Sequence, residues 1–329
     1  MAFIRTVLGD IDPSEFGVCD SHEHMFRSGG PEVDHDKDFR LDDLDASIAE
    51  TEDWLGAGGK SMVLMDPIGC GRNVEKTVAL AEAFRGRAHF VTTTGFQKGD
   101  FYDHKVSFAA TNSVEDLVEQ MALEVNEGLD LHSYNGPIVK RVPYKAGVIK
   151  AGTGYSFISA FEQKTLTVAA KTQLRTGVPI SIHTQQGTMG LEAAKFLIDQ
   201  GAVPGHTVVC HSQKNPDRFY HKQILETGVY VCYDGPDRAK YFPDSVHADN
   251  LKWLIEQGFQ KQLLLSMDAG RASYQKAHMA KVGKMANGIS YLLERFVPTL
   301  LEAGISQEAV DDMLIYNPAK AFSFVEAGA

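Results

Sequence analysis

Cysteine is scarce in this sequence, and no two cysteines form a CxxC pair. The chain has 4 cysteines in 329 residues. Cys19, Cys210 and Cys232 lie inside strand-like apolar runs, whereas Cys70 lies in the glycine-rich segment 67–73. This pattern argues against a disulfide framework. We expect buried, reduced thiols in a cytoplasmic protein.

The sequence also lacks long hydrophobic runs and an excess of basic charge. No apolar run reaches the roughly 18 residues of a membrane span, and residues 1–17 show no basic stretch followed by a long apolar core. We therefore expect neither membrane insertion nor secretion. The 32 lysines and arginines are outnumbered by 43 acidic residues, giving a formal net charge of −11. This balance argues against general nucleic-acid binding, which needs a basic footprint, and any anionic ligand would need a local basic cluster.

The chain does contain a regular alternation of short apolar runs and amphipathic segments. Eight runs rich in Val, Ile, Leu and Thr begin near Gly17, Ser61, Phe90, Ala146, Val178, Thr207, Tyr230 and Gln262. Helical patterns occupy residues 41–58, 73–87, 113–129, 156–177, 189–201, 215–228 and 249–258, with a closing helix over 285–304 and a helical cap over 305–324.

Near-continuous apolar strands separated by amphipathic helices indicate a parallel sheet that is covered on its outer face. Eight such units predict an α/β fold of the (β/α)8 TIM-barrel type, formed by one domain over residues 1–329. The alternative fold is an open, doubly wound sheet. That alternative does not explain the placement of the polar residues described next.

Six residues with metal-binding potential lie where predicted strands end. They follow the first, fourth, fifth, sixth and eighth runs, and are His22, His24, Lys150, His183, His211 and Asp268. Active sites of TIM barrels are built at the C-terminal ends of the strands. His22 and His24 are two residues apart, so their side chains point in the same direction from a strand. A single histidine at a strand end is usually structural, but this whole pattern indicates one metal site.

Lys150 is the most informative of the six. Imidazoles and carboxylates are ordinary ligands for divalent metals, but a protonated lysine is not. The position therefore predicts a lysine carboxylated by CO2 to a carbamate, which implies two divalent metal ions. Zinc is the default expectation, although manganese, cobalt or iron would fit. Such ions lower the pKa of bound water, which leaves Asp268 as the catalytic residue that carries the proton.

The loops after the seventh and eighth runs contain the basic cluster that an anionic substrate needs. Arg238 and Lys240 lie in the first loop, and Arg271 and Tyr274 lie in the second. These two loops form the recurrent phosphate site of TIM barrels. Lys240, Arg271 and Tyr274 could supply a point charge, a planar fork and a hydroxyl to a phosphate monoester. The alternative is that Lys240 and Arg271 are solvated loop charges.

Several other polar residues are weaker candidates or have a structural explanation. The weaker substrate candidates are Arg238, after the seventh run, and Lys98 and Tyr102, after the third run. Asp20 shares a strand face with His22, and we expect it to satisfy buried polar groups. Four histidines have no matching partners in the pattern and are given no role: His104, His221, His247 and His278.

The six-residue pattern resembles the phosphotriesterase family of the amidohydrolase superfamily, over nearly the whole chain. The resemblance implies that His22, His24 and Asp268 hold the more buried metal. It further implies that His183 and His211 hold the more exposed metal, and that carboxylated Lys150 bridges both. The related TatD-type nucleases have a glutamate where this chain has Lys150, which argues against them.

The set of Lys240, Arg271 and Tyr274 resembles a branch of that family that hydrolyses phosphorylated sugar lactones. It implies a metal-dependent lactonase that converts a phosphorylated sugar (aldono) lactone to the phosphorylated hydroxy acid, with a homodimer as a family-level expectation. One alternative is a phosphotriesterase or an N-acyl-homoserine lactonase, which would need an apolar pocket at these loops. A second alternative is a non-catalytic metal-binding scaffold.

Overall fold

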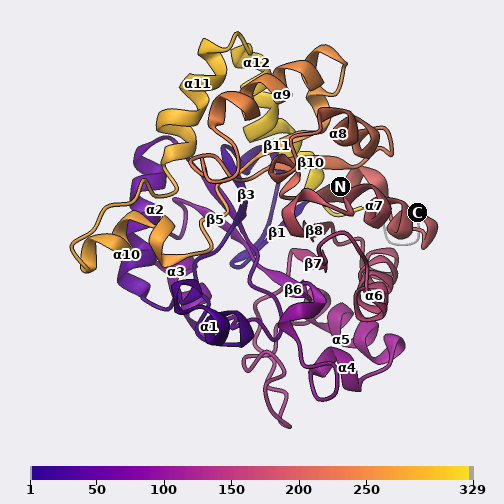
Figure 1. The fold of residues 1–329 in the computed structure, drawn as a ribbon. Coiled ribbons are helices and arrows are strands. Elements are labelled where there is room, and N and C mark those ends of the chain that lie inside the picture. The colour runs from indigo at the N-terminus through magenta and orange to yellow at the C-terminus, as the bar shows by residue number, and fades with distance from the viewer. Residues whose placement is uncertain (1, 326–329) are drawn as a thin grey trace.

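Eight parallel strands form a closed barrel in the computed structural model, which describes residues 2–325 (Figure 1). A three-stranded sheet contains β3 (Cys19–Glu23), β4 (Ser61–Leu64) and β5 (His89–Val91). A six-stranded sheet contains β6 (Thr93–Gly95), β7 (Val148–Thr153), β8 (Ile180–Thr184), β9 (Thr207–Val209), β10 (Tyr230–Tyr233) and β11 (Leu263–Leu265). β5 and β6 follow each other directly and make up the third barrel strand.

The barrel closes between its first and last strands. The backbone nitrogen of Asp268 donates to the carbonyl oxygen of His22 at 3.0 Å, and Ser266 Oγ lies 2.6 Å from the same oxygen. The predicted TIM barrel is therefore confirmed, and all eight predicted strands are present. Closure places the segments after β3 and β11 side by side.

Helices surround the barrel, as Figure 1 shows. The helices between successive strands are α2 (Leu44–Gly56), α3 (Val74–Ala83), α5 (Val114–Asn126), α6 (Ala160–Thr176), α7 (Gly190–Asp199), α8 (Arg218–Leu225) and α9 (Asp244–Glu256). Local chemistry sets their ends. Ser159 and Glu162 form a capping box at the start of α6, and Gly177 ends that helix at φ 77°.

Short helices lie in the loops at both ends of the barrel. The label η marks a 3-10 helix, except that η9 and η10 are π-helices. The loops carry α1 (Pro31–His35), η1 (Pro13–Glu15), η2 (Lys37–Phe39), η3 (Gly99–Phe101), α4 (Phe108–Thr111), η4 (Gln185–Gly187), η5 (Pro204–His206), η6 (Ser212–Lys214), η7 (Gln260–Gln262), η8 (Ala272–Tyr274) and α10 (Lys276–Lys281). The C-terminal part contains η9 (Leu292–Phe296), α11 (Val297–Glu302), α12 (Gln307–Asp311), η10 (Asp312–Tyr316) and α13 (Asn317–Ala321). An antiparallel hairpin of β1 (Ile4–Thr6) and β2 (Gly9–Ile11) was not predicted.

Apolar side chains fill both the barrel interior and the layer between strands and helices. The interior cluster includes Val63, Val91, Val148, Val208 and Leu264, all fully buried. All four cysteines are buried and none forms a disulfide, as expected. No helix within residues 2–325 combines the length and the apolar character that crossing a bilayer requires.

Gly95 at the end of β6 allows the third barrel strand to approach the fourth closely. Its φ is 88°, and a Cβ placed there would lie 2.2 Å from the carbonyl oxygen of Lys150. Only glycine combines the positive φ with this approach. The position of Lys150 therefore depends on a residue without a side chain.

Replacing Gly95 with alanine should destabilise the protein by about 3–5 kcal/mol, because a positive φ and a backbone clash act together. Gly86→Ala is the matched control, since Gly86 has φ 75° and an added Cβ would have no other atom within 4 Å. It should cost only about 1–2 kcal/mol. Urea denaturation measures both free energies of unfolding. Equal losses would show that the approach to Lys150 adds no constraint.

Candidate functional site

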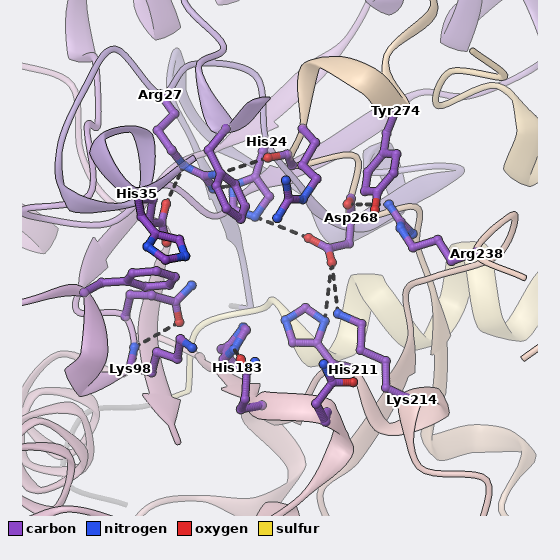
Figure 2. A pocket seen from close by; sticks show the side chains of 18 of the residues that line it. His24, Arg27, His35, Lys98, His183, His211, Lys214, Arg238, Asp268 and Tyr274 are labelled. Carbon is purple, nitrogen blue, oxygen red and sulfur yellow. Dashed lines mark hydrogen bonds and ion pairs between the residues drawn. The ribbon is translucent and has the colours of Figure 1, made fainter. Parts of the chain in front are cut away.

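A polar cavity of about 280 Å³ opens at the C-terminal ends of the strands. His24, His183, His211 and Asp268 line it (Figure 2). Figure 2 shows His35 and Lys98 on one side of these residues and Tyr274, Arg238 and Lys214 on the other. The cavity therefore lies where the barrel fold predicts an active site.

The structure brings all six predicted residues together. Lys150 Nζ lies 3.0 Å from His22 Nε2, and both side chains are buried. Asp268 Oδ1 lies 3.4 Å from His24 Nε2 and 3.9 Å from His22 Nε2. Asp268 Oδ2 lies 3.6 Å from His211 Nδ1. The sixth residue is His183, whose ring centroid is 4.4 Å from that of His211.

The backbone turns sharply at two of these positions. His211 has φ 64° and Asp268 has φ 48°, so both adopt a left-handed conformation just after β9 and β11. Such conformations are costly for residues other than glycine, and they concentrate at functional sites. Here they occur at residues whose side chains reach the same cavity.

Burial controls the charges of Lys150 and of three of the four histidines, whereas at His24 neighbouring carboxylates, above all Asp66, together outweigh burial and raise the pKa. Burial lowers the pKa of His22, His183 and His211 well below the ordinary histidine value, so their imidazoles are neutral at pH 7. Burial likewise lowers the pKa of Lys150. Neutral nitrogen bases with free lone pairs are the form in which metal ions are bound.

Asp268, unlike these buried bases, is held in its charged form. Burial alone would raise its pKa, but His211 and Lys214 outweigh that effect and hold the pKa well below the ordinary aspartate value. Asp268 is therefore ionised at neutral pH. A carboxylate beside three or more imidazoles is a donor set that suits divalent metals such as zinc.

An unsatisfied polar atom supports the same interpretation. Among residues 2–325, His22 Nδ1 is buried without a hydrogen-bond partner. The other ring nitrogen, His22 Nε2, has the amine of Lys150 as its hydrogen-bond partner and Asp268 Oδ1 at 3.9 Å. Because buried polar groups normally have partners, this group of nitrogen bases and a carboxylate matches a cation better than it matches another side chain. The residues present thus fit a metal centre.

Two carboxylates that the sequence analysis missed contact the rings of His24 and His211 and orient them. Asp66, two residues after β4, has Oδ1 2.7 Å from His24 Nδ1 and accepts from Arg27 Nε at 3.0 Å. Asp234, directly after β10, has Oδ1 2.8 Å from His211 Nδ1. Both lie at strand ends, which was an available signal. Such carboxylate–histidine pairs fix the ring orientation in metal sites.

Asp20 has the structural environment that the sequence analysis expected. It is fully buried and accepts from the Ser266 hydroxyl, from Met267 N at 3.2 Å and from His22 N at 3.3 Å. These bonds join β3 to the end of β11. Asp20 therefore helps to close the barrel beneath the cavity.

Of the three residues predicted to bind phosphate, two contact each other and the third pairs with a different residue. Lys240 Nζ donates to the Tyr274 hydroxyl at 2.7 Å, whereas Arg271 pairs with Asp36 at 2.5 Å. Arg238 is buried and donates to the carbonyl oxygens of Met267 at 2.5 Å and Asp268 at 2.6 Å, so backbone groups occupy its guanidinium.

Lys214 is a cation that the sequence analysis missed. It lies in η6, its Nζ is 3.6 Å from Asp268 Oδ2, and it stands 5.7 Å from the ring centroid of Tyr241. Lys214 lines the cavity together with Tyr274 and Arg271. Its position three residues after His211, in a short helical turn, was the signal that could have identified it.

Of the weaker substrate candidates, Lys98 lines the cavity, whereas Tyr102 stabilises a loop beside it. Lys98 lines the cavity, with Nζ 3.4 Å from Asp100 Oδ2. The Tyr102 hydroxyl donates to Ile68 O at 2.7 Å and accepts from Gln97 N at 2.9 Å, which holds the loop after β6. His35 lines the cavity although the sequence pattern did not identify it.

Comparison with known proteins identifies the family. Residues 2–322 match the model of the phosphotriesterase family. The chain belongs to this family. The family resemblance drawn from the six residues is thus confirmed.

Several known proteins are similar to this chain over nearly their full length. The chain is 49% identical over 325 residues to the phospho-furanose lactonase of Mycoplasmopsis agalactiae, covering 98% of this chain and 92% of that protein. A crystal structure of an amidohydrolase from Mycoplasma synoviae has a TM-score of 0.97 at 46% identity, covering 99% and 93% of the two chains. A lactonase from Listeria monocytogenes has a TM-score of 0.89 at 30% identity, covering 98% and 100%.

Asp66→Asn should weaken divalent-metal binding about 10–100-fold, because an amide holds the His24 ring less firmly than a carboxylate does. Chelator competition measures the dissociation constant directly. Asp199→Asn, at an exposed position at the end of α7, removes the same charge away from the site and should have no effect. Unchanged affinity in Asp66→Asn would exclude this supporting role.

Proposed function

We propose that this protein is a binuclear metal-dependent lactonase that hydrolyses a phosphorylated sugar lactone to the phosphorylated hydroxy acid. The observation that carries the proposal is the convergence of Lys150 with four histidines and Asp268 at the cavity. The name of the Mycoplasmopsis agalactiae relative, phospho-furanose lactonase, supports the substrate class.

The metal assignment follows the donor set. In this proposal His22, His24 and Asp268 would hold the more buried ion, and His183 and His211 would hold the more exposed one. Lys150, carboxylated by CO2, would be a ligand shared by the two ions, which we propose to be zinc. The lowered pKa of Lys150 supports carboxylation, because only a neutral amine captures CO2. When bound, the two ions supply Lewis-acid stabilisation of an oxyanion and lower the pKa of water.

Asp268 moves the proton in the proposed reaction. Water adds to the lactone carbonyl, and the ring C–O bond breaks to leave an alkoxide. The ionised Asp268 carboxylate accepts the proton of the attacking water and delivers it to the alkoxide oxygen. Its low pKa keeps the carboxylate ionised at neutral pH.

The basic wall of the cavity selects the substrate. Tyr274, Arg271 and Lys214 line the cavity, and Lys240, which is not among the lining residues, donates a hydrogen bond to the Tyr274 hydroxyl. These cations provide the local basic cluster that a protein of net charge −11 needs to bind a phosphate. A phosphotriesterase or N-acyl-homoserine lactonase would need an apolar wall here instead.

The same proposal covers the remaining expectations. We propose that residues 1–329 act as one catalytic domain in the cytoplasm, which suits the buried free cysteines. We also propose a homodimer, on the family resemblance alone, and no role in nucleic-acid binding.

Elemental analysis after metal-replete expression should find two divalent ions per chain, and Lys150→Met should retain fewer than one because the shared ligand is lost. Lys171→Met, at an exposed position of α6, is the control and should keep two. Fewer than one ion in the unaltered protein would favour a non-catalytic scaffold.

Lys240→Ala and Arg271→Ala should each raise KM for a phosphorylated lactone by about 10–100-fold, since each removes about 1.5–3 kcal/mol of charge-assisted hydrogen bonding. Metal content should stay at the wild-type value. Lys284→Ala, which removes an exposed charge elsewhere, should leave KM unchanged. If wild-type kcat/KM is the same for the unphosphorylated lactone, the phosphate site is excluded.

A further inference from the structure

Arg271 is held by two carboxylates of the loop that follows β3. Arg271 Nη1 lies 2.5 Å from Asp36 Oδ2 and 3.4 Å from Asp38 Oδ2. Its Cζ atom stands 3.9 Å from the ring centroid of Phe39. The guanidinium is therefore restrained by charge at one nitrogen and by an aromatic ring close to its centre.

Other bonds fix both carboxylates. Asp36 accepts from the backbone nitrogen of Asp38 at 3.0 Å and so caps η2. Asp38 accepts from Ser273 N at 2.9 Å and from the Ser273 hydroxyl at 2.6 Å. These bonds join η2 to η8. The positions of the two acids are thus set by backbone groups as well as by Arg271.

The contacts occupy only one end of the guanidinium. Among the described residues, the hydrogen bonds of the Arg271 side chain all use Nη1. A guanidinium has five N–H donors in one plane, so Nε and Nη2 keep a free pair of donors. Arg271 lines the cavity, and its side chain is 27% exposed. A two-oxygen anion matches such a pair.

We propose that Asp36 and Asp38 are positioning residues that hold Arg271 in the orientation in which its free nitrogens receive the phosphate of the substrate. This inference rests on the proposed function, because it takes the phosphorylated lactone as the ligand. Two carboxylates also repel a phosphate, but water in the open mouth screens that repulsion. A preorganised fork loses less entropy on binding than a freely moving side chain does.

The test compares Asp36→Asn with Asp34→Asn in the metal-loaded protein. Asp34 is an exposed residue of α1, so its variant removes the same charge without touching Arg271. A phosphorylated pentitol serves as a probe that cannot be hydrolysed, with its dissociation constant measured by calorimetry. Asp36→Asn should weaken binding about tenfold, and Asp34→Asn should change it less than about twofold. Thermal unfolding verifies that both variants are folded.

A second comparison establishes whether Asp36 acts through Arg271. In the Arg271→Ala background, Asp36→Asn should weaken binding no further. For the lactone phosphate, Asp36→Asn should raise KM and leave kcat unchanged, and Arg271→Lys, which keeps charge but not the fork, should not restore binding.

Each contrary result has a definite meaning. Tighter binding in Asp36→Asn would show that Asp36 competes with phosphate, which overturns the inference. An undiminished effect in the Arg271→Ala background, or no probe binding by wild type, overturns it as well. If wild type binds the probe as expected but hydrolyses no lactone phosphate, the positioning role stands and the proposed reaction fails.

Discussion

The contact between Lys150 and His22 is the constraint around which the site is organised. Two nitrogen bases meet at 3.0 Å in the barrel interior, where both are buried. Burial lowers the pKa of each, so neither is stabilised there as a cation. A buried pair of nitrogen bases that burial disfavours as cations is suited to a partner other than a proton. The carbamate on Lys150 and the metal ions that we propose would resolve this conflict, because the anion and the cations would satisfy one another.

Groups that lie progressively farther from Lys150 and His22 hold this pair in place. Gly95 lets the third barrel strand approach Lys150, and Asp20 joins β3 to the end of β11. Asp66 and Asp234 then orient His24 and His211 from outside. The loops after β10 and β11 form the outermost part. In the proposed function the strand ends would carry the chemistry and these loops would choose the substrate.

Much of the fold could be predicted from sequence because it rests on local periodicity. Apolar runs located all eight barrel strands, and strand alternation placed His22 and His24 together. The β1–β2 hairpin was missed because each of its strands has three residues, too few to show a pattern. The pairing of Arg271 with Asp36 could not be predicted, since the two residues are 235 positions apart and meet only through loop packing.

The chemical state of Lys150 can be measured directly by solution NMR of the metal-loaded protein prepared with isotope-labelled bicarbonate. The account predicts a carbamate carbon signal that is absent from Lys150→Met and disappears when chelators remove the metals. A fully metal-loaded protein with no such signal, and with an unmodified amine at Lys150, would contradict it.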